Sequence, residues 1–527
     1  MQLKRVKVED YKCLLDFQVD FNIVDGGSLT VLIGENGTGK STLLEFVLMV
    51  LMSFDIPSVE KCVRTNYEIE YLYAGSEIII RNLDGRYEVF KNGSLIASGK
   101  ISTVRNILKE KNISLFPKRI ITFYSGNNDK LLMLIKKANR IYRNNCKKMI
   151  VDYIRNLSGQ DSKIINIVTR KYNYCEESLT DIYLVALLIG NRNYEREYLQ
   201  HNSHINKILY IDVELDCSNF MKFTDYGSER KTNNFILSCV ELLNDEFYDV
   251  FQRGFLYVNY NKAYYTLEYF ENINADTVSV YEFLEKLNAI FNMKIRVMIK
   301  IGTDIVESIN LSEGQRQLIK VLGMLGVCKN EDCLVIMDEP DAHMNPKWKY
   351  EIRSSIEKLL GNVNNIQAII ATHEPLLVNG LDKEFIRIFT YNDAVEKYNN
   401  KFVAKAIKPQ DNTIGMGIDG LLQSEYYGLS TVLDSKTQKM VDEKRDLMIK
   451  RRDNTITDSE KVKLNELTEN IENLYFARNI PTNNFFDEFV MAMHEVYKNR
   501  EKVKLSREEI EDRNKISVEI MERLMKK

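Results

Sequence analysis

The chain has 527 residues, of which 44% are hydrophobic and 28% are charged, and its formal net charge is −3. This length predicts two or three domains, and the balanced charge argues against a protein whose whole surface coats nucleic acid. The 8 cysteines form no C-x-x-C pair, the N-terminus lacks an apolar signal segment, and no apolar run approaches the roughly 20 residues that cross a bilayer, so we expect a reduced cytoplasmic protein without a zinc site or membrane contact.

The N-terminal part is predicted to contain several strands and one helix. Alternating and continuous apolar residues predict strands within residues 1–33, and 43–54 form an apolar segment of helical length. Residues 66–97 alternate and turn at the dipeptides Asp84-Gly85 and Asn92-Gly93, which indicates β-hairpins. Arg119–Phe123 is predicted to be a buried strand.

A phosphate-binding loop follows the third predicted strand. Residues 34–41, G-E-N-G-T-G-K-S, match the pattern G-x-x-x-x-G-K-[ST] between a buried strand and a helix. Glycines let backbone N–H groups converge on phosphate oxygens, and the helix N-terminus adds positive potential. We expect Lys40 to reach the β- and γ-phosphates and the Ser41 hydroxyl to bind Mg²⁺. The predicted nucleotide contacts of this loop are Asn36, Gly37, Thr38, Gly39, Lys40, Ser41 and Thr42.

The remaining chain divides by pattern. Residues 131–295 show mostly helical patterns with some extended runs, whereas Leu334–Met337 and Ala368–Ala371 are short apolar strands typical of a sheet covered on both faces. After about residue 410 the chain is helical and charged, and Val441–Leu474 is predicted to form two antiparallel helices. We therefore expect domains at 1–130, 131–295, 296–410 and 411–527, the last a probable oligomer or partner contact.

A second anion-binding pattern is predicted at residues 311–317, L-S-E-G-Q-R-Q, which precede an amphipathic helix at 319–327. Ser312 is suited to cap that helix, and the backbone at Gly314 and Gln315 is suited to approach an anion. An ordinary capped helix is the alternative. The position of this segment, after a phosphate loop and before an acidic strand, favours the anion-binding interpretation.

Two strand ends carry the predicted catalytic groups. Asp338 ends the run L-V-I-M-D and is placed to hold Mg²⁺, and Glu339 is placed to orient or deprotonate an attacking water. The run I-I-A-T-H ends at His373, which is suited to hydrogen-bond a γ-phosphate. Downstream, Asn345 and Pro346 are predicted to cap and begin the next helix.

Together these motifs resemble the ABC class of ATPases, with Walker A, signature, Walker B and switch histidine in order. The resemblance implies an α/β P-loop head with a mainly helical insertion and a helical C-terminal region. It also implies a homodimer or higher oligomer in which Ser312 and Gly314 contact the ATP of another copy. His343 would then lie near that interface, where a contact across subunits is favoured over a metal-ligand role.

The long gap between Walker A and signature is similar to the SMC, RecF and OLD-like branch of this class. The segment D-E-P-D-A-H-M-N-P resembles ATPases of bacterial anti-phage systems, including Septu (PtuA) and retron-linked ATPases. Residues 418–431 resemble the same proteins more weakly. Two positions depart from the class: Glu313 replaces a commoner glycine, and no glutamine follows Phe123, so a Mg²⁺-sensing role would fall to Ser125, Asn127 or Asn128.

A nuclease activity in this chain is not expected. The only HNH-like segment, residues 201–204, has no metal-binding context and is predicted to be a polar loop. The basic run at residues 130–148 is interpreted either as a nucleic-acid contact or as a solvated helix face.

The resemblance thus implies an ATPase subunit of an anti-phage complex that regulates a separate HNH-type nuclease or other effector. The alternatives are a RecF/SMC-type repair or chromosome-maintenance ATPase, and an ABC ATPase of a transporter or translation factor.

Overall fold

The computed structural model describes the chain apart from residues 25, 58, 61–62, 125–128, 158–169, 191–192, 221–227, 271–272, 329–331, 362–365, 392–402, 475–483, 498–503 and 527. The described residues form two compact units. One comprises Met1–Leu377 and Glu384–Lys408, and the other comprises Val378–Lys383 and Pro409–Lys527. The four-domain division predicted from the sequence stays a prediction.

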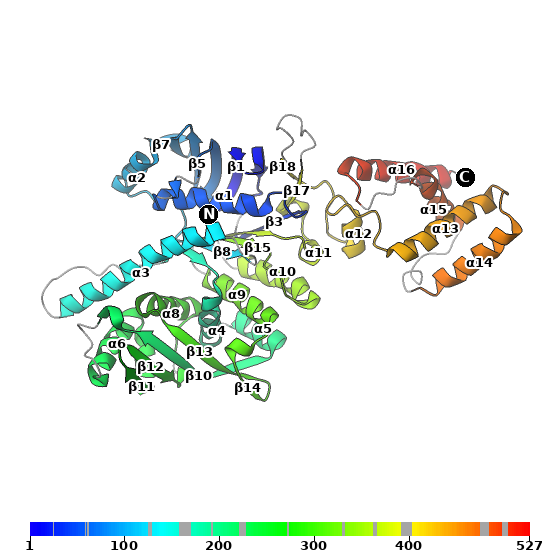
Figure 1. The fold of residues 1–527 in the computed structure, drawn as a ribbon. Coiled ribbons are helices and arrows are strands. Elements are labelled where there is room, and N and C mark those ends of the chain that lie inside the picture. Colours follow the sequence, from blue (N-terminus) through cyan, green and yellow to red (C-terminus); the bar gives the residue numbers. More distant parts are fainter. Residues whose placement is uncertain are drawn as a thin grey trace. The chain divides into compact units, whose positions relative to one another are not determined.

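A seven-stranded sheet with strand order β18-β17-β3-β16-β15-β8-β9 lies at the centre of the first unit (Figure 1). Its strands are parallel except for β18. Those at its centre are almost fully buried, as expected for a sheet covered on both faces. The bounds are β3 Ser28–Gly34, β8 Arg119–Tyr124, β9 Tyr172–Tyr174, β15 Cys333–Asp338, β16 Gln367–Ala371, β17 Ile386–Tyr391 and β18 Ala404–Ile407.

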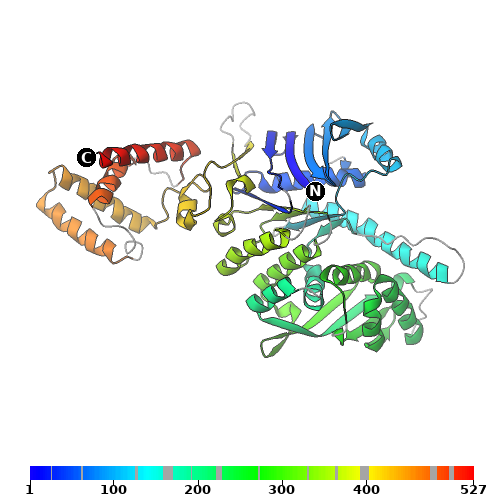
Figure 2. The same cartoon turned by 180° about the vertical axis from the view of Figure 1, so that it is seen from behind.

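A six-stranded antiparallel sheet, of order β2-β1-β4-β5-β6-β7, lies on one side of the central sheet (Figure 2). Both predicted hairpins are confirmed, because Asp84, Gly85, Asn92 and Gly93 all have positive φ, as type I′ turns require. The bounds are β1 Gln2–Tyr11, β2 Leu14–Asp20, β4 Tyr67–Tyr73, β5 Ser76–Leu83, β6 Arg86–Lys91 and β7 Ser94–Gly99.

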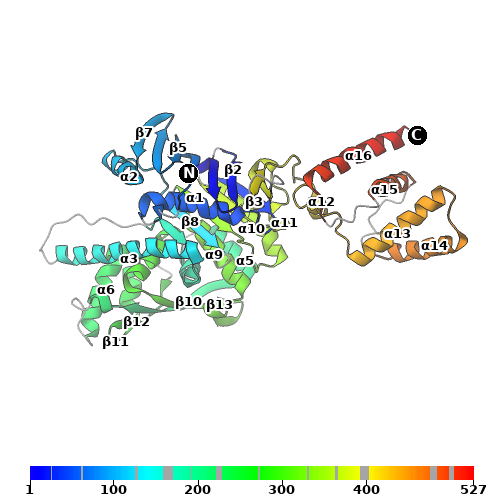
Figure 3. The same ribbon diagram turned by 45° about the horizontal axis from the view of Figure 1, so that its top comes forward.

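A lobe on the other side of the central sheet contains a five-stranded antiparallel sheet that the sequence analysis did not place (Figure 3). Its order is β11-β12-β10-β13-β14. Two features weaken its signal: register shifts against β13 interrupt the first half of β10, so that its burial alternates only from Ile211 onward, and the side chains of β11 are at most half-buried although four of the five are apolar. The bounds are β10 Ile205–Asp216, β11 Phe255–Asn259, β12 Lys262–Leu267, β13 Lys294–Ile301 and β14 Asp304–Glu307.

The helices of the first unit supply most of the predicted helical insertion and cover the sheets. The segment predicted as a polar loop at 201–204 is instead largely the last turn of α5. The bounds are α1 Lys40–Asp55, α2 Ile101–Glu110, α3 Asp129–Leu157, α4 Thr180–Ile189, α5 Asn193–Ser203, α6 Glu229–Leu243, α7 Tyr248–Arg253, α8 Thr277–Phe291, α9 Glu313–Val327, α10 Pro346–Gly361 and α11 Pro375–Val378.

A buried polar network joins the lobe to the central sheet. Arg170, which precedes β9, forms an ion pair of 3.1 Å with Glu285 of α8, and Tyr142 of α3 donates to the same carboxylate at 2.5 Å. All three side chains are nearly inaccessible to solvent. Since removing one partner of such a pair leaves a buried charge, the network fixes α3 and α8 against β9.

Tyr142 therefore faces inward on α3, whereas the basic side chains at 136, 137, 140, 143 and 148 are exposed. An exposed basic face fits both a solvated helix surface and a nucleic-acid contact, so the choice between them stays a prediction.

The second unit is helical, as predicted. The two helices expected within Val441–Leu474 are confirmed as α13 Ser435–Arg452 and α14 Asp458–Glu472, which pack through Leu447, Leu464 and Leu467. Asp434 caps α13, and Thr457 with Glu460 forms a capping box on α14. The other helices are α12 Gly417–Gln423, α15 Asn484–Tyr497 and α16 Arg507–Met525.

The packing of α9 against α4 gives a first prediction. A Cβ atom at Gly323 would lie 2.5 Å from Cβ of the buried Tyr183, so Gly323→Ala should lower the free energy of unfolding by about 1–3 kcal/mol. Gly326, in the same helix, has its nearest atom at an ordinary 3.5 Å. Gly326→Ala should therefore stabilise by roughly 0.5–1 kcal/mol through helix propensity.

Urea unfolding followed by far-ultraviolet circular dichroism distinguishes these two outcomes. Equal effects of the two substitutions would contradict the packing described.

Candidate active site

The topology brings the predicted motifs together at the carboxyl ends of neighbouring strands of the central sheet. Strands β3, β16 and β15 are parallel neighbours, and β16 lies between the other two. Their carboxyl ends therefore lie side by side, and open α/β sheets bind ligands just outside the carboxyl ends of their strands. The phosphate loop follows β3, Asp338 ends β15, and Thr372-His373 follows β16.

The phosphate loop is held by Lys40. This side chain is 5% exposed, and its ammonium group donates to the carbonyl oxygens of Gly34 at 2.7 Å and Glu35 at 3.0 Å. Burial lowers the pKa of Lys40 below its ordinary value. Gly37 and Gly39 have φ of 85° and 99°, a region that favours glycine. The loop therefore presents a cation and glycine backbone at the start of α1.

Two tyrosines that the sequence analysis missed support this loop. The Tyr391 hydroxyl donates to the Asn36 carbonyl at 3.4 Å and would lie 2.8 Å from a Cβ at Gly37. The Tyr124 hydroxyl donates to the Ser41 carbonyl at 3.1 Å. Both tyrosines end strands of the central sheet, and a tyrosine at a strand end gives no signal by itself of what it contacts.

Thr38 lies within the loop and Thr42 follows it, and the side chains of both make contacts that hold it. Thr38 Oγ1 donates to the Glu35 carbonyl at 2.7 Å, and Thr42 Oγ1 lies 3.8 Å from the Cys13 sulfur. A Cβ at Gly39 would approach the Cys13 Sγ to 3.1 Å. The turn between β1 and β2 therefore packs directly against the phosphate loop.

Ser41 and Asp338 contact each other at the carboxyl end of the sheet. The Ser41 hydroxyl donates to Asp338 Oδ1 at 3.0 Å, and Asp338 is 8% exposed. Burial raises the pKa of Asp338 to about 6, and the neighbouring Glu339 adds to this shift. A hydroxyl beside one poorly compensated carboxylate suits Mg²⁺, which is commonly held by one or two carboxylates together with substrate phosphates.

Glu339 and His373 form the second pair. Glu339 Oε1 lies 2.7 Å from His373 Nδ1, and the Glu339 backbone N–H donates to the Ala371 carbonyl at 2.8 Å. Glu339 has φ of 52°, a left-handed conformation that is uncommon for this residue type. The backbone thus holds the Glu339 side chain beside the histidine at the carboxyl end of β16.

A buried aspartate whose role the sequence analysis did not recognise fixes this second pair. Asp341 is 3% exposed and accepts a hydrogen bond of 3.0 Å from Thr372 Oγ1. Thr372 Oγ1 in turn accepts from the Glu374 backbone N–H at 3.0 Å, and Glu374 forms an ion pair of 2.6 Å with Lys349. The residues on either side of His373 are therefore anchored to the loop that carries Glu339.

A family model described as an AAA ATPase domain matches residues 1–378, which include every motif above. The chain belongs to the AAA ATPase domain family. It is therefore a nucleotide-binding ATPase, and the predicted α/β P-loop fold is confirmed.

Several curated proteins are similar to this AAA ATPase. Over 127 residues it is 30% identical to Septu protein PtuA of Bacillus mycoides (strain KBAB4), a match that covers 23% of this chain and only 16% of PtuA. It is 23% identical to the Retron Vc95 probable ATPase of Vibrio cholerae serotype O1 biovar El Tor, over 86% of this chain and 84% of that protein.

A third relative is the DNA replication and repair protein RecF of Clostridioides difficile (strain 630), 22% identical over 40% of this chain and 57% of RecF.

Among solved structures, an Smc head domain bound to the C-terminal domain of ScpA from Pyrococcus furiosus matches with 15% identity. The match covers 77% of this chain and 96% of the Smc chain. Its TM-score is 0.33.

The segment predicted as the signature begins α9. Ser312 and Gln315 form a reciprocal capping box, and Gln315 Nε2 also donates to the Ser203 carbonyl at 3.4 Å. A Cβ at Gly314 would lie 3.0 Å from the His343 carbonyl oxygen and 3.3 Å from the ring of Trp348. These contacts tie the signature to α5 and α10 of its own chain.

The segment after Glu339 begins α10 as predicted. Asn345 Oδ1 accepts from the Trp348 N–H at 2.9 Å, and Pro346 is the first helical residue. His343 Nε2 lies 3.4 Å from Glu313 Oε1 of the same chain. The predicted contact of His343 across subunits stays a prediction. Ser125, Asn127 and Asn128 lie outside the described residues.

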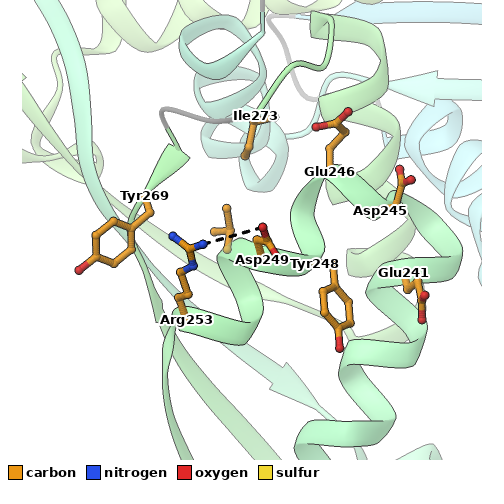
Figure 4. A pocket seen from close by; sticks show the side chains of 9 residues that line it. Glu241, Asp245, Glu246, Tyr248, Asp249, Arg253, Tyr269 and Ile273 are labelled. Carbon is orange, nitrogen blue, oxygen red and sulfur yellow. Dashed lines mark ion pairs between the residues drawn. The ribbon is translucent and has the colours of Figure 1, made fainter.

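A cavity of about 390 Å³ in the lobe is chemically distinct from this site (Figure 4). An ion pair of 4.0 Å joins Arg253 to Asp249 at its wall. An acidic wall repels a triphosphate, so the cavity does not compete with the phosphate loop as the nucleotide site. The polar lining residues are Glu241, Asp245, Glu246, Tyr248, Asp249, Arg253 and Tyr269.

Within the described part of the chain, no group of three or more His, Cys, Asp and Glu residues is arranged to hold a metal ion. None of the helices in that part is long and apolar enough to span a membrane.

The environment of Asp338 gives a second prediction. Its pKa in the fold, about 6, lies above the ordinary value of 3.8, so the folded state binds the proton more tightly than the unfolded state. The free energy of unfolding therefore falls as pH rises from about 4 to about 6 and stays lowered above that range. Asp338→Asn should stabilise the nucleotide-free protein by about 2–3 kcal/mol at pH 8 and by about 1 kcal/mol at pH 4.5.

Chemical unfolding at the two pH values measures the effect, with Asp10→Asn, an exposed residue of β1, as the control. A stabilisation by Asp338→Asn that is the same at both pH values would contradict the assigned burial cost.

Proposed function

We propose that this ATPase hydrolyses ATP at the carboxyl ends of β3, β15 and β16. The observation that carries the proposal is the pairing of Ser41 with Asp338, next to the pair of Glu339 with His373. A phosphate cradle, a metal-binding pair and a base with its orienting partner then converge on one place, as phosphoryl transfer to water requires.

Each group has a separate task in the proposed reaction. Lys40 and the loop N–H groups bind the β- and γ-phosphates and offset their charge. Glu339 orients the attacking water and accepts its proton, while His373 positions the Glu339 carboxylate in the free chain and turns the same N–H to the γ-phosphate when ATP is bound. Ser41 and Asp338 would hold Mg²⁺, which supplies charge neutralisation when bound.

We further propose that two copies associate through ATP, with Ser312, Gly314 and Gln315 of one copy contacting the γ-phosphate held by the other. The exposed Ser312 at the start of α9 supports this arrangement, because a helix N-terminus open to solvent favours an anion. Hydrolysis would remove the γ-phosphate and release the two copies, a two-state change driven by one ligand group.

The output proposed for this cycle is control of a separate effector protein in a cytoplasmic anti-phage complex. The similarity to Septu protein PtuA and to the Retron Vc95 probable ATPase supports this assignment, the second over most of both chains. An HNH-type nuclease is the effector we favour. The similarity to RecF supports a second candidate, an ATPase that acts on DNA in repair.

A third prediction tests the reaction. Glu339→Gln keeps the size of the side chain but removes the base, so it should lower the ATP hydrolysis rate by about 100-fold or more while ATP binding persists. Hydrolysis is measured by phosphate release and binding by isothermal titration calorimetry. Glu110→Gln, on the exposed end of α2, is the matched control. A Glu339→Gln variant with an unchanged hydrolysis rate would exclude the proposed base.

A fourth prediction separates the two candidate outputs. Affinity purification of the tagged Glu339→Gln protein from its native cells, with ATP present, should recover a specific effector protein, and the Lys40→Ala protein should not. Recovery of no protein, together with tight ATP-dependent DNA binding by the chain alone, would favour the repair function instead.

A further inference from the structure

We propose that His343 is a positioning residue that partners the Glu313 carboxylate, so that the start of α9 can accept the γ-phosphate of an ATP bound to a second copy. This inference rests on the proposed ATP-dependent association. It accounts for the charged residue Glu313 in the signature, which phosphate binding alone would not predict.

Glu313 presents an electrostatic conflict at this position. It is the first residue of α9, and its side chain is 74% exposed. A carboxylate at a helix N-terminus is favoured in the free chain, because it faces the positive end of the helix dipole. An arriving phosphate would have to occupy the same positive region, so the carboxylate would repel it.

His343 meets the signature through both its side chain and its backbone. Its Nε2 lies 3.4 Å from Glu313 Oε1, and its carbonyl oxygen would lie 3.0 Å from a Cβ at Gly314. A side chain at position 314 would therefore require the His343 backbone to shift by a few tenths of an ångström. The glycine thus serves the contact within the chain as well as any approach of phosphate.

The loop that carries His343 is held in place at several points. Gln317 of α9 donates to the Pro340 carbonyl at 3.1 Å, and the Met344 N–H donates to the Asp341 carbonyl at 3.2 Å. Met344 is buried, and His343 itself has φ of 63°. Because the same loop begins with Glu339, the position of the imidazole is coupled to that of the proposed catalytic base.

The pair should matter only in the assembly. In the free chain the side chains of His343 and Glu313 are 55% and 74% exposed, so solvent screens their interaction. A second copy that covers the signature would desolvate both groups, and a carboxylate left there without a partner would then oppose association. Loss of His343 should therefore weaken the dimer and leave the stability of the monomer nearly unchanged.

The test is a double-mutant cycle in the full chain, built on Glu339→Gln so that ATP is not consumed. His343→Asn removes the imidazole while tolerating the positive φ, and His343→Gly is a second variant that relieves it fully. Glu313→Gln removes the charge. The dissociation constant of the ATP-bound dimer is measured by sedimentation velocity, and each monomer's thermal midpoint is recorded without nucleotide.

We expect His343→Asn to weaken the dimer by about 10-fold, Glu313→Gln to change it by less than about 2-fold, and the double variant to return to within about 2-fold of the parent. Rescue by Glu313→Gln distinguishes a role of His343 as partner of the Glu313 carboxylate from a role in packing. The single tryptophan, Trp348, lies against Gly314 and offers a second readout, because its fluorescence should change with ATP in the parent and in the rescued variant.

Lys7→Ala is the matched control, since Lys7 and Glu68 form a surface pair with the same 3.4 Å separation on the six-stranded sheet. Dimers of equal affinity in the parent and in both His343 variants would overturn the inference, as would a double variant as weak as His343→Asn. A parent that does not associate with ATP would overturn the proposed association itself, and the two failures are therefore distinguishable.

Discussion

The hydrogen bond between Ser41 and Asp338 is the interaction on which the arrangement of the site depends. It joins residues 297 positions apart, and it connects the first turn of α1 to the end of β15 across the intervening β16. The central sheet makes this meeting possible, because parallel strands align their carboxyl ends. The lobe, inserted in sequence between these two residues, is held against the same sheet by the buried pair of Arg170 and Glu285.

Two constraints of different kinds act on the segment from Glu339 to Asn345. Backbone geometry sets the direction of Glu339 and His343, both of which have positive φ. Buried hydrogen bonds from Thr372 to Asp341 and from Gln317 to Pro340 then anchor the segment to β16 and α9. Strain at two residues is thus retained by partners on both sides, a pattern typical of sites where geometry decides the chemistry.

The sequence alone predicts those elements of this site whose proposed roles depend on residues that are neighbours in the chain. The phosphate loop, the strand ends at Asp338 and His373, and the capping of α9 and α10 are local patterns with fixed spacing, and each element forms where it was expected. Tyr391, Tyr124 and Asp341 could not be assigned from sequence, because their roles arise from contacts with residues distant in the chain. The five-stranded sheet of the lobe was not placed either, because the first half of β10 lacks an alternating pattern and both strands that pair with it, β12 and β13, are distant in the chain.

The hydrogen bonds of Lys40 have a consequence for how nucleotide is exchanged. Its ammonium group already donates to the carbonyl oxygens of Gly34 and Glu35, so an arriving phosphate replaces existing bonds instead of adding new ones. On departure of the product, the lysine returns to the same two oxygens and needs no water to solvate a buried cation. At the proposed site, entry and exit of nucleotide would then exchange hydrogen bonds of Lys40 instead of leaving its buried ammonium group without acceptors.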